Sequence, residues 1–251
     1  MISFINCGRV LERKDTSPVK VSLYLKNVGD AKLEKITCRN YQGHGIIVDE
    51  LDNNLNADNI ILKENSLYCR KDSFCNGGGL QLNFSKTVEK NVNFKNVEFS
   101  NLQSSRPRSD PSIQHDRKAF YDVHGKGSAI AIQLYENAKE NHITFKKILL
   151  ENNSAEYGGS IVVFDSNELN KIQFISLKIH NSTSLFHGGG ILYYSRSNNS
   201  VLKNPFLCKV CTFMNCSTIY GFGGAIWIYR TDTLTKKYKN YTLQNLSLIH
   251  I

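Results

Sequence analysis

Residues 211–229, CTFMNCSTIYGFGGAIWIY, combine two short apolar segments, a polar turn and a glycine pair. The first segment places Phe213 and Asn215 at alternate positions, and the second follows Gly223 and Gly224 directly. Apolar residues at alternate positions are typical of strands that bury one face. The stretch therefore predicts two β-strands joined through a polar turn and a glycine corner.

The same pattern recurs along the chain at intervals of roughly 30 to 35 residues, which indicates a repeat architecture. Its first half begins with an apolar residue and two arbitrary residues. Two further apolar residues and an asparagine follow at alternate positions, with one arbitrary residue between neighbours. The regular copies of this half are 33–40, 94–101, 145–152, 174–181 and 208–215. The second half alternates after a glycine corner, with the apolar pairs Ile46/Val48, Leu80/Leu82, Ile130/Ile132, Ile161/Val163, Ile191/Tyr193 and Ile226/Ile228.

One copy and both ends of the chain depart from this regularity. Ile60 and Leu62 are followed by two residues, instead of one, before Asn65. The chain begins with residues that match the end of a first half, Ile2, Phe4 and Asn6, and it ends with the start of another, Leu243, Leu246 and Leu248. We therefore expect residues 1–251 to form a single repeat domain that is a piece of a longer repeat protein.

A repeat of two or three short strands cannot bury its apolar face alone. Stacked copies bury it when each strand pairs in parallel with its counterpart in the next copy, at about 4.8 Å. We therefore predict an all-β fold, a right-handed parallel β-helix of about six to seven coils. The recurrent asparagines and glycines are interpreted as corner residues, because both tolerate left-handed backbone. A leucine-rich repeat is the competing shape, but it needs only one strand per repeat.

The longest connection between an asparagine and its glycine corner is an insertion at residues 103–126. Insertions at one point of a repeat become loops on one side of a stacked structure, where contacts with partners are common. The insertion therefore predicts a protruding loop. Its candidate partner-binding residues are Arg106, Arg108, Arg117 and Lys118.

The repeat halves carry a family resemblance. The segments FIN at 4–6, FSN at 99–101 and FMN at 213–215, together with GGSI at 158–161 and GGAI at 223–226, resemble the FxxN and GGAI repeats of the chlamydial polymorphic outer membrane proteins, which also occur in protist surface proteins. In most copies here, one residue separates the last apolar position from the asparagine, whereas the family motif has two residues between its phenylalanine and its asparagine. The resemblance covers residues 2–251 and implies a pectin lyase-like right-handed β-helix. It implies an adhesin-like role and supplies no catalytic residues.

Composition and charge limit the kinds of partner. The chain has 41% hydrophobic and 21% charged residues, as a soluble globular protein does. Its formal net charge is +9 and its isoelectric point is about 9.1, which favours contact with polyanions: acidic glycans, a membrane surface or nucleic acid. No nucleic-acid-binding module is recognisable, so nucleic acid is not expected as a partner. No apolar run of about 18 residues occurs, so no membrane span is expected.

The seven cysteines give no clear disulfide framework and no compartment. Cys208 and Cys211 have the spacing of redox and zinc sites, but both fall on apolar positions of the repeat, as Cys38 does. We interpret all three as small buried apolar residues. A zinc site needs a second pair of ligands, and we expect no metal and no other cofactor.

Two histidine motifs resemble catalytic sequences. The GHG tripeptide around His44 is similar to the motif of pectin-cleaving β-helix hydrolases, which also need paired carboxylates for acid–base chemistry. The only aspartates upstream of it are Asp15 and Asp30. His187 precedes three glycines, as in the oxyanion loop of lipases, but the sequence contains no GxSxG nucleophile motif. We therefore expect no catalytic residues.

Several asparagines begin Asn-x-Ser/Thr sequons, which accept glycans in exported eukaryotic proteins. Those at the corners, Asn152, Asn181 and Asn215, are expected to be partly buried and poorly accessible. The remaining candidate glycosylation sites are Asn83, Asn198, Asn240 and Asn245.

Together these features predict a non-enzymatic structural or adhesive module at the cell surface or outside the cell. Its loops would face a ligand on a host cell, either a glycan or a protein. The alternative is a carbohydrate-active enzyme, or the remnant of one, on the same pectin lyase-like fold. An enzyme of this kind should gather acidic and basic residues on neighbouring coils, where this sequence has asparagine, serine, tyrosine and lysine. A third alternative is a fragment with no function of its own.

Overall fold

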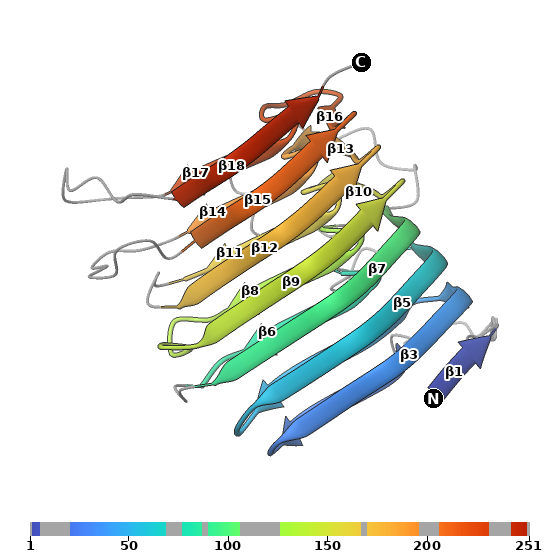
Figure 1. The fold of residues 1–251 in the computed structure, drawn as a ribbon, viewed down its shortest axis with the longest axis vertical. Coiled ribbons are helices and arrows are strands. Elements are labelled where there is room, and N and C mark those ends of the chain that lie inside the picture. The colour runs from blue at the N-terminus through green and yellow to red at the C-terminus, as the bar shows by residue number, and fades with distance from the viewer. Residues whose placement is uncertain are drawn as a thin grey trace.

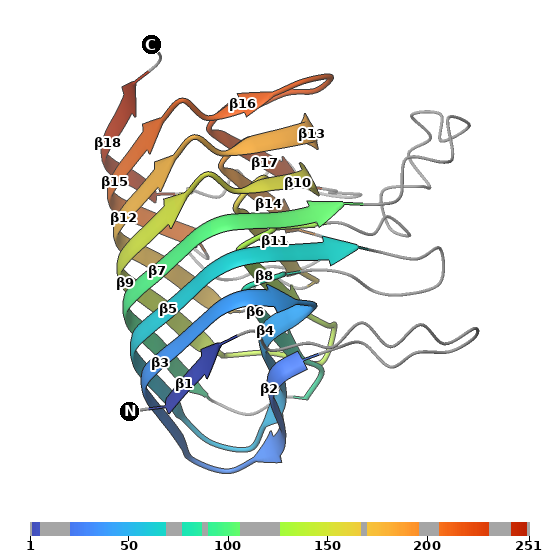
Figure 2. The same cartoon turned by 90° about the vertical axis from the view of Figure 1, so that its right-hand side faces the viewer.

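The structure is a computed structural model that describes residues 2–5, 21–68, 77–86, 90–105, 126–166, 170–195, 206–230 and 242–249. Every regular element in these ranges is a β-strand, which confirms the predicted all-β class. Figures 1 and 2 show two sheets that lie against each other with their strands stacked along one direction.

The larger sheet is formed by long strands, and it curls around the core (Figure 2). In spatial order its main strands are β1 (Ile2–Ile5), β3 (Ala31–Gln42), β5 (Leu55–Tyr68), β7 (Asn91–Ser105), β9 (His142–Glu151), β12 (Lys171–His180), β15 (Phe206–Met214) and β18 (Thr242–Ile249). Three short strands continue its curled edge beside the end of β7, namely β10 (Ser154–Tyr157), β13 (Thr183–His187) and β16 (Ser217–Thr218).

The smaller sheet has seven strands in the same stacking order. These are β2 (Val21–Val28), β4 (His44–Leu51), β6 (Leu80–Phe84), β8 (Ile130–Leu134), β11 (Ile161–Asp165), β14 (Ile191–Ser195) and β17 (Ile226–Arg230). The chain alternates between the two sheets, and all strand pairs in the described residues are parallel. Each passage through both sheets therefore adds one strand to each of them.

Strand register places the predicted apolar positions in columns. In the large sheet, Phe94 pairs with Phe145 and Phe145 with Phe174, while in the small sheet Ile161 pairs with both Ile130 and Ile191. These side chains are at most 1% exposed and belong to one core cluster between the sheets. The apolar alternation thus predicted both the strands and the face that each strand buries.

The two ends also pair as predicted. Ile2 and Phe4 lie in register with Ile36 and Cys38 of β3. At the other end, the three leucines of β18, Leu243, Leu246 and Leu248, lie in register with Cys208, Cys211 and Phe213 of β15. The remaining predicted half-copy residue, Asn6, lies outside the described residues.

The asparagine corners have left-handed backbone, as predicted. Asn152, Asn181 and Asn215 have φ values of 53°, 51° and 51°. Their side chains form a ladder, in which Asn181 Nδ2 donates to Asn152 Oδ1 at 3.0 Å and Asn215 Nδ2 donates to Asn181 Oδ1 at 3.2 Å. In the irregular copy, Glu64 takes this left-handed position with φ 58°, and Asn65 is the buried residue that follows it.

A second left-handed column crosses the large sheet and explains the two arbitrary residues in the repeat. At this position the strands bend, so apolar residues three apart in sequence both face the core. Six strands place a left-handed residue here, with φ between 54° and 57°: Lys35, Asn59, Asn96, Lys147, Ser176 and Val210. Left-handed backbone costs an ordinary L-residue roughly 1–2 kcal/mol, so this column is maintained by register and not by residue type.

Replacement of Val210 by asparagine should stabilise the protein. Val210 is β-branched, has φ 57° and is 47% exposed, and a β-branched residue is strongly disfavoured in left-handed backbone. We expect the Val210→Asn variant to gain about 1 kcal/mol in the free energy of unfolding, measured by urea denaturation. Thr212→Asn, on the same strand but without positive φ, should give no gain. Equal effects of the two substitutions would contradict the backbone explanation.

Candidate functional site

The predicted partner-binding loop begins and ends beside the short edge strands. Its candidate residues, Arg106, Arg108, Arg117 and Lys118, lie outside the described residues. The insertion is shorter at its start than predicted, because Gln103 and Ser104 continue β7 and pair with Ser154 and Ala155 of β10. Strand pairing overrides the polar composition of this stretch. At the other end, Lys126 forms a parallel bridge with Tyr157.

A row of aromatic side chains starts at Tyr157, where the end of the insertion pairs with β10. Tyr157 stacks on Phe186 with ring centroids 4.9 Å apart. The His187 ring stacks on Trp227 at 4.1 Å and lies nearly parallel to Phe222 at 5.7 Å. Aromatic side chains in contact stabilise one another and supply large apolar surfaces to interfaces. We call Tyr157, Phe186, His187, Phe222 and Trp227 the aromatic row.

The repeat itself brings three members of the aromatic row together. Tyr157, His187 and Phe222 each precede the left-handed glycine of a corner. The backbone joins these positions from one strand layer to the next, because Gly158 N donates to His187 O at 2.8 Å and Gly188 N donates to Phe222 O at 3.0 Å. This column was not predicted, although an aromatic residue or histidine stands before each of these glycine pairs in the sequence.

The outer side of the small sheet next to the row is also apolar. Val162 and Leu192 point away from the main core, yet both are 0% exposed and form a separate cluster with Ala131. Tyr157, Phe164 and Trp227 pack against this cluster, and Lys126 Nζ lies 4.4 Å from the centre of the Phe164 ring. This is a cation–π contact, and it connects the end of the insertion to the apolar patch.

Large apolar side chains are exposed at the corner between β16 and β17. Ile219, Tyr220 and Phe222 are 59%, 69% and 71% exposed. Large exposed apolar patches on a soluble protein are typical of interaction surfaces. The corner and the aromatic row therefore form the strongest candidate binding surface in the described part of the chain.

His187 is positioned by packing and by one hydrogen bond. Its Nδ1 accepts the backbone N–H of Phe222 at 3.1 Å, which requires an unprotonated Nδ1 and leaves the proton of the neutral ring on Nε2. The half-buried ring is also stacked between neighbours. These contacts give the HGGG segment a structural role at a corner.

His44 lies in the interior of the protein. Its side chain is 1% exposed, and Nδ1 donates to the carbonyl oxygen of Gly77 at 3.1 Å. Asp30 instead lies in the turn before β3, where Oδ1 accepts from the backbone and side-chain amides of Asn54. Asp15 lies outside the described residues. The carboxylate that the GHG chemistry needs is not among the hydrogen-bond partners of His44 in the described structure.

Burial of His44 should make stability depend on pH. Loss of solvation lowers its pKa from 6.5 to about 4, so the unfolded chain binds a proton between these values while the folded chain does not. The free energy of unfolding is therefore not reduced by His44 above pH 6.5, and it decreases as pH falls from 6.5 toward 4, because protonation favours the unfolded chain. We expect His44→Asn to flatten the pH dependence of the free energy of unfolding over this range. A pH dependence that is as steep in His44→Asn as in the unmodified chain would contradict this assignment.

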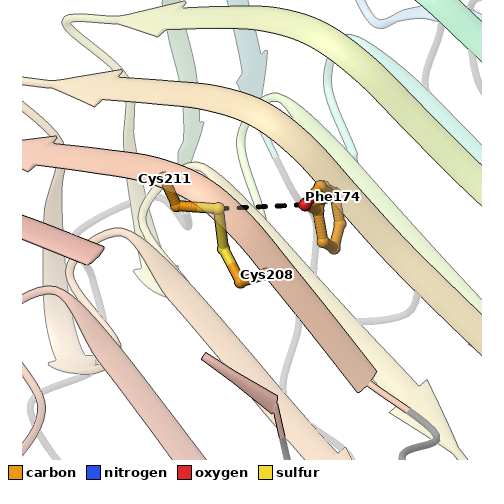
Figure 3. Close-up of a disulfide and its surroundings, with 3 residues drawn as sticks. All are labelled: Phe174, Cys208 and Cys211. Carbon is orange, nitrogen blue, oxygen red and sulfur yellow. Dashed lines mark hydrogen bonds between the residues drawn. A yellow bond between two sulfur atoms is a disulfide. The ribbon is translucent and has the colours of Figure 1, made fainter. Parts of the chain in front are cut away.

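Cys208 and Cys211 form a disulfide, shown in Figure 3, which corrects the expectation of plain buried cysteines. Both are 0% exposed, as predicted, and their Cα atoms are 6.1 Å apart. The left-handed bend at Val210 turns both side chains inward, so their sulfur atoms meet. Cys211 Sγ lies 3.9 Å from the carbonyl oxygen of Phe174 on the neighbouring strand.

The other described cysteines, Cys38 and Cys216, are buried. Burial raises the pKa of the Cys216 thiol to about 11, which disfavours the reactive thiolate. No group of three or more histidine, cysteine or acidic residues in the described ranges could hold a metal ion. Among the same residues, there is no helix with the length and apolar character needed to cross a bilayer.

The candidate glycosylation sites are only partly described. Asn83 lies on β6, is half-buried, and its Oδ1 accepts from Gln81 Nε2 at 3.0 Å. Asn245 belongs to β18, whereas Asn198 and Asn240 lie outside the described residues. The expected burial of the corner sequons is wrong for Asn152 and Asn181, which are exposed. Left-handed backbone turns these side chains along the outer surface.

Comparisons with family models, with curated proteins and with solved structures found no match for this chain.

Proposed function

We propose that this chain is a right-handed parallel β-helix that serves as a non-enzymatic adhesive module at the cell surface or outside the cell. Alternation of the chain between two sheets, parallel pairing and in-register apolar columns support this architecture. The right hand follows the strong preference of parallel crossovers. A relationship to the polymorphic outer membrane protein repeats belongs to the same proposal and rests on the quoted motifs.

The observation that supports the adhesive function is that the aromatic row lies beside Lys126, the last residue of the long insertion. Tyr157 connects the two features, because it pairs with Lys126 and stacks on Phe186. Phe222 is exposed and the other four members of the row are half-buried. Aromatic side chains on a rigid framework bind partners well, since they bury a large area and lose little conformational freedom. We propose that the row and the insertion together contact a glycan or protein ligand on another cell.

The test is a binding assay of the purified chain on target cells and on a glycan array. Deletion of residues 106–118 and the substitution Phe222→Ala should each weaken binding. Phe222 is 71% exposed, so its loss should leave the fold intact. Tyr24→Ala, at a 50% exposed position on β2, is the matched control. Binding that survives both changes would contradict the proposal.

A catalytic assay tests the alternative. The pectin lyase-like enzyme hypothesis predicts turnover of a polyuronate, abolished by His44→Ala. The burial of His44 in this structure argues against access of a substrate to its imidazole. We expect no turnover by the unmodified chain, and measured turnover that depends on His44 would favour the enzyme.

A further inference from the structure

The outer face of the large sheet has an uneven charge distribution. Figure 1 looks onto this sheet, whose strands run side by side. Strands β9, β12 and β15 contain five lysines and only one acidic residue, Glu151. With Lys95 on the adjoining strand β7, these lysines are all exposed, and we call them the lysine face: Lys95, Lys146, Lys147, Lys171, Lys178 and Lys209.

The acidic residues nearest to this face already form ion pairs or hydrogen bonds with side chains outside it. Glu151 Oε1 lies 3.3 Å from His180 Nδ1, and Glu98 forms an ion pair with Lys63. Asp58 lies in register with Lys95, but its Oδ1 accepts from Asn96 Nδ2 at 2.7 Å. None of the ion pairs between described residues includes a member of the lysine face.

Register also places like charges side by side. Lys95 of β7 lies directly opposite Lys146 of β9, and adjacent strands are about 4.8 Å apart. Like charges at opposed positions of a sheet are destabilising. The first strands of the same sheet differ, since Lys32 pairs with Glu34 at 2.9 Å and the next ion pair joins β5 to β7. The concentration of unbalanced lysines is therefore confined to one half of the face.

The side chains between the lysines suit a sugar better than a base. Thr144, Gln173 and Thr212 are half-buried and polar, and they supply donors and acceptors for hydroxyl groups. All phenylalanines of these strands point inward and are buried, so the face offers no aromatic platform for bases. Proteins that bind single-stranded nucleic acid use such platforms together with positive charge.

We propose that the lysine face binds a linear acidic polysaccharide, sulfated or rich in uronic acids. Charge complementarity attracts the polymer, and lysines repeated across several strands contact its successive anionic groups. Bound anions also remove the repulsion between Lys95 and Lys146. This binding is independent of the aromatic row and of the function proposed for it.

The test measures binding of heparin to the chain, with neutral dextran as the control polymer. The variant K146E/K178E/K209E should weaken heparin binding by about tenfold or more, because three contacts become repulsive. The matched variant K26E/K35E/K86E changes the net charge equally, at exposed lysines outside the lysine face, and it should retain most of the affinity. Replacement of the same three lysines of the face by arginine should also preserve binding. Affinity should fall as salt increases, since exposed charges are screened.

Several outcomes would overturn the proposal. Equal losses from the two glutamate variants would show a net-charge effect without a site. Tighter binding of duplex DNA than of heparin would assign the face to nucleic acid, and binding only to anionic lipid vesicles would assign it to a membrane surface. The variant without residues 106–118 separates the two sites, because heparin binding should survive that deletion even if cell adhesion is lost. Loss of heparin binding on the deletion would place the site in the insertion.

Discussion

Replacement of Phe145 by alanine should lower the free energy of unfolding by about 3–5 kcal/mol. The Phe145 ring is 0% exposed and stacks between Phe94 and Phe174, each with its ring centre 5.1 Å away. Its removal leaves a cavity that strands fixed on both sides cannot close. Urea denaturation followed by far-ultraviolet circular dichroism measures the loss.

The neighbouring residue provides the control for this experiment. Lys146 follows Phe145 on the same strand but points to solvent, so Lys146→Ala should change the free energy of unfolding by no more than about 0.5 kcal/mol. A loss below about 1 kcal/mol for Phe145→Ala would mean that the phenylalanine column does not form a packed core.

The second large effect is expected from Gly189→Ala. A methyl group at this position would overlap the backbone carbonyl oxygens of Gly224 and Ser217. Both belong to the next layer of strands, so the clash cannot be relieved by rotation of a side chain. We expect a loss of about 3 kcal/mol or more, or failure to accumulate as folded protein.

Another glycine tests whether this effect comes from packing. A methyl group on Gly29 would have Asn53 Nδ2 as its nearest neighbour, at 3.9 Å, which is ordinary contact. Gly29→Ala should therefore be close to neutral in the same unfolding experiment. Similar losses for the two glycines would point to a general glycine effect and against close approach of the strand layers.

The columns of the core could be predicted from the sequence because their signal is repeated. Phe145, Ile148 and Leu150 are buried at the same repeat positions as Phe174, Leu177 and Ile179, and each pair lies in register. The alternation that identifies a strand also identifies its buried face, and repetition fixes which strands are neighbours. The left-handed asparagine corners followed from the same repetition.

Other features left no comparable signal. The second left-handed column is occupied by residues as different as Lys147, Ser176 and Val210, because register imposes this conformation whatever the side chain. The disulfide between Cys208 and Cys211 depends on that bend, so the cysteine spacing alone could not reveal it. The binding surfaces depend on side chains from separate strands, which become neighbours only when the layers stack.

Parallel pairing between successive layers also determines how the protein comes apart. Along the main path of the large sheet, each described inner strand pairs with the strand before it and the strand after it in stacking order, and β7 also pairs with the short strand β10. Breaking the contacts of an outermost layer therefore leaves the inner layers paired, as in other one-dimensional arrays. Amide protons of β7 and β9 should exchange with deuterium most slowly, and those of β18 should exchange first, because opening of the array begins at its ends.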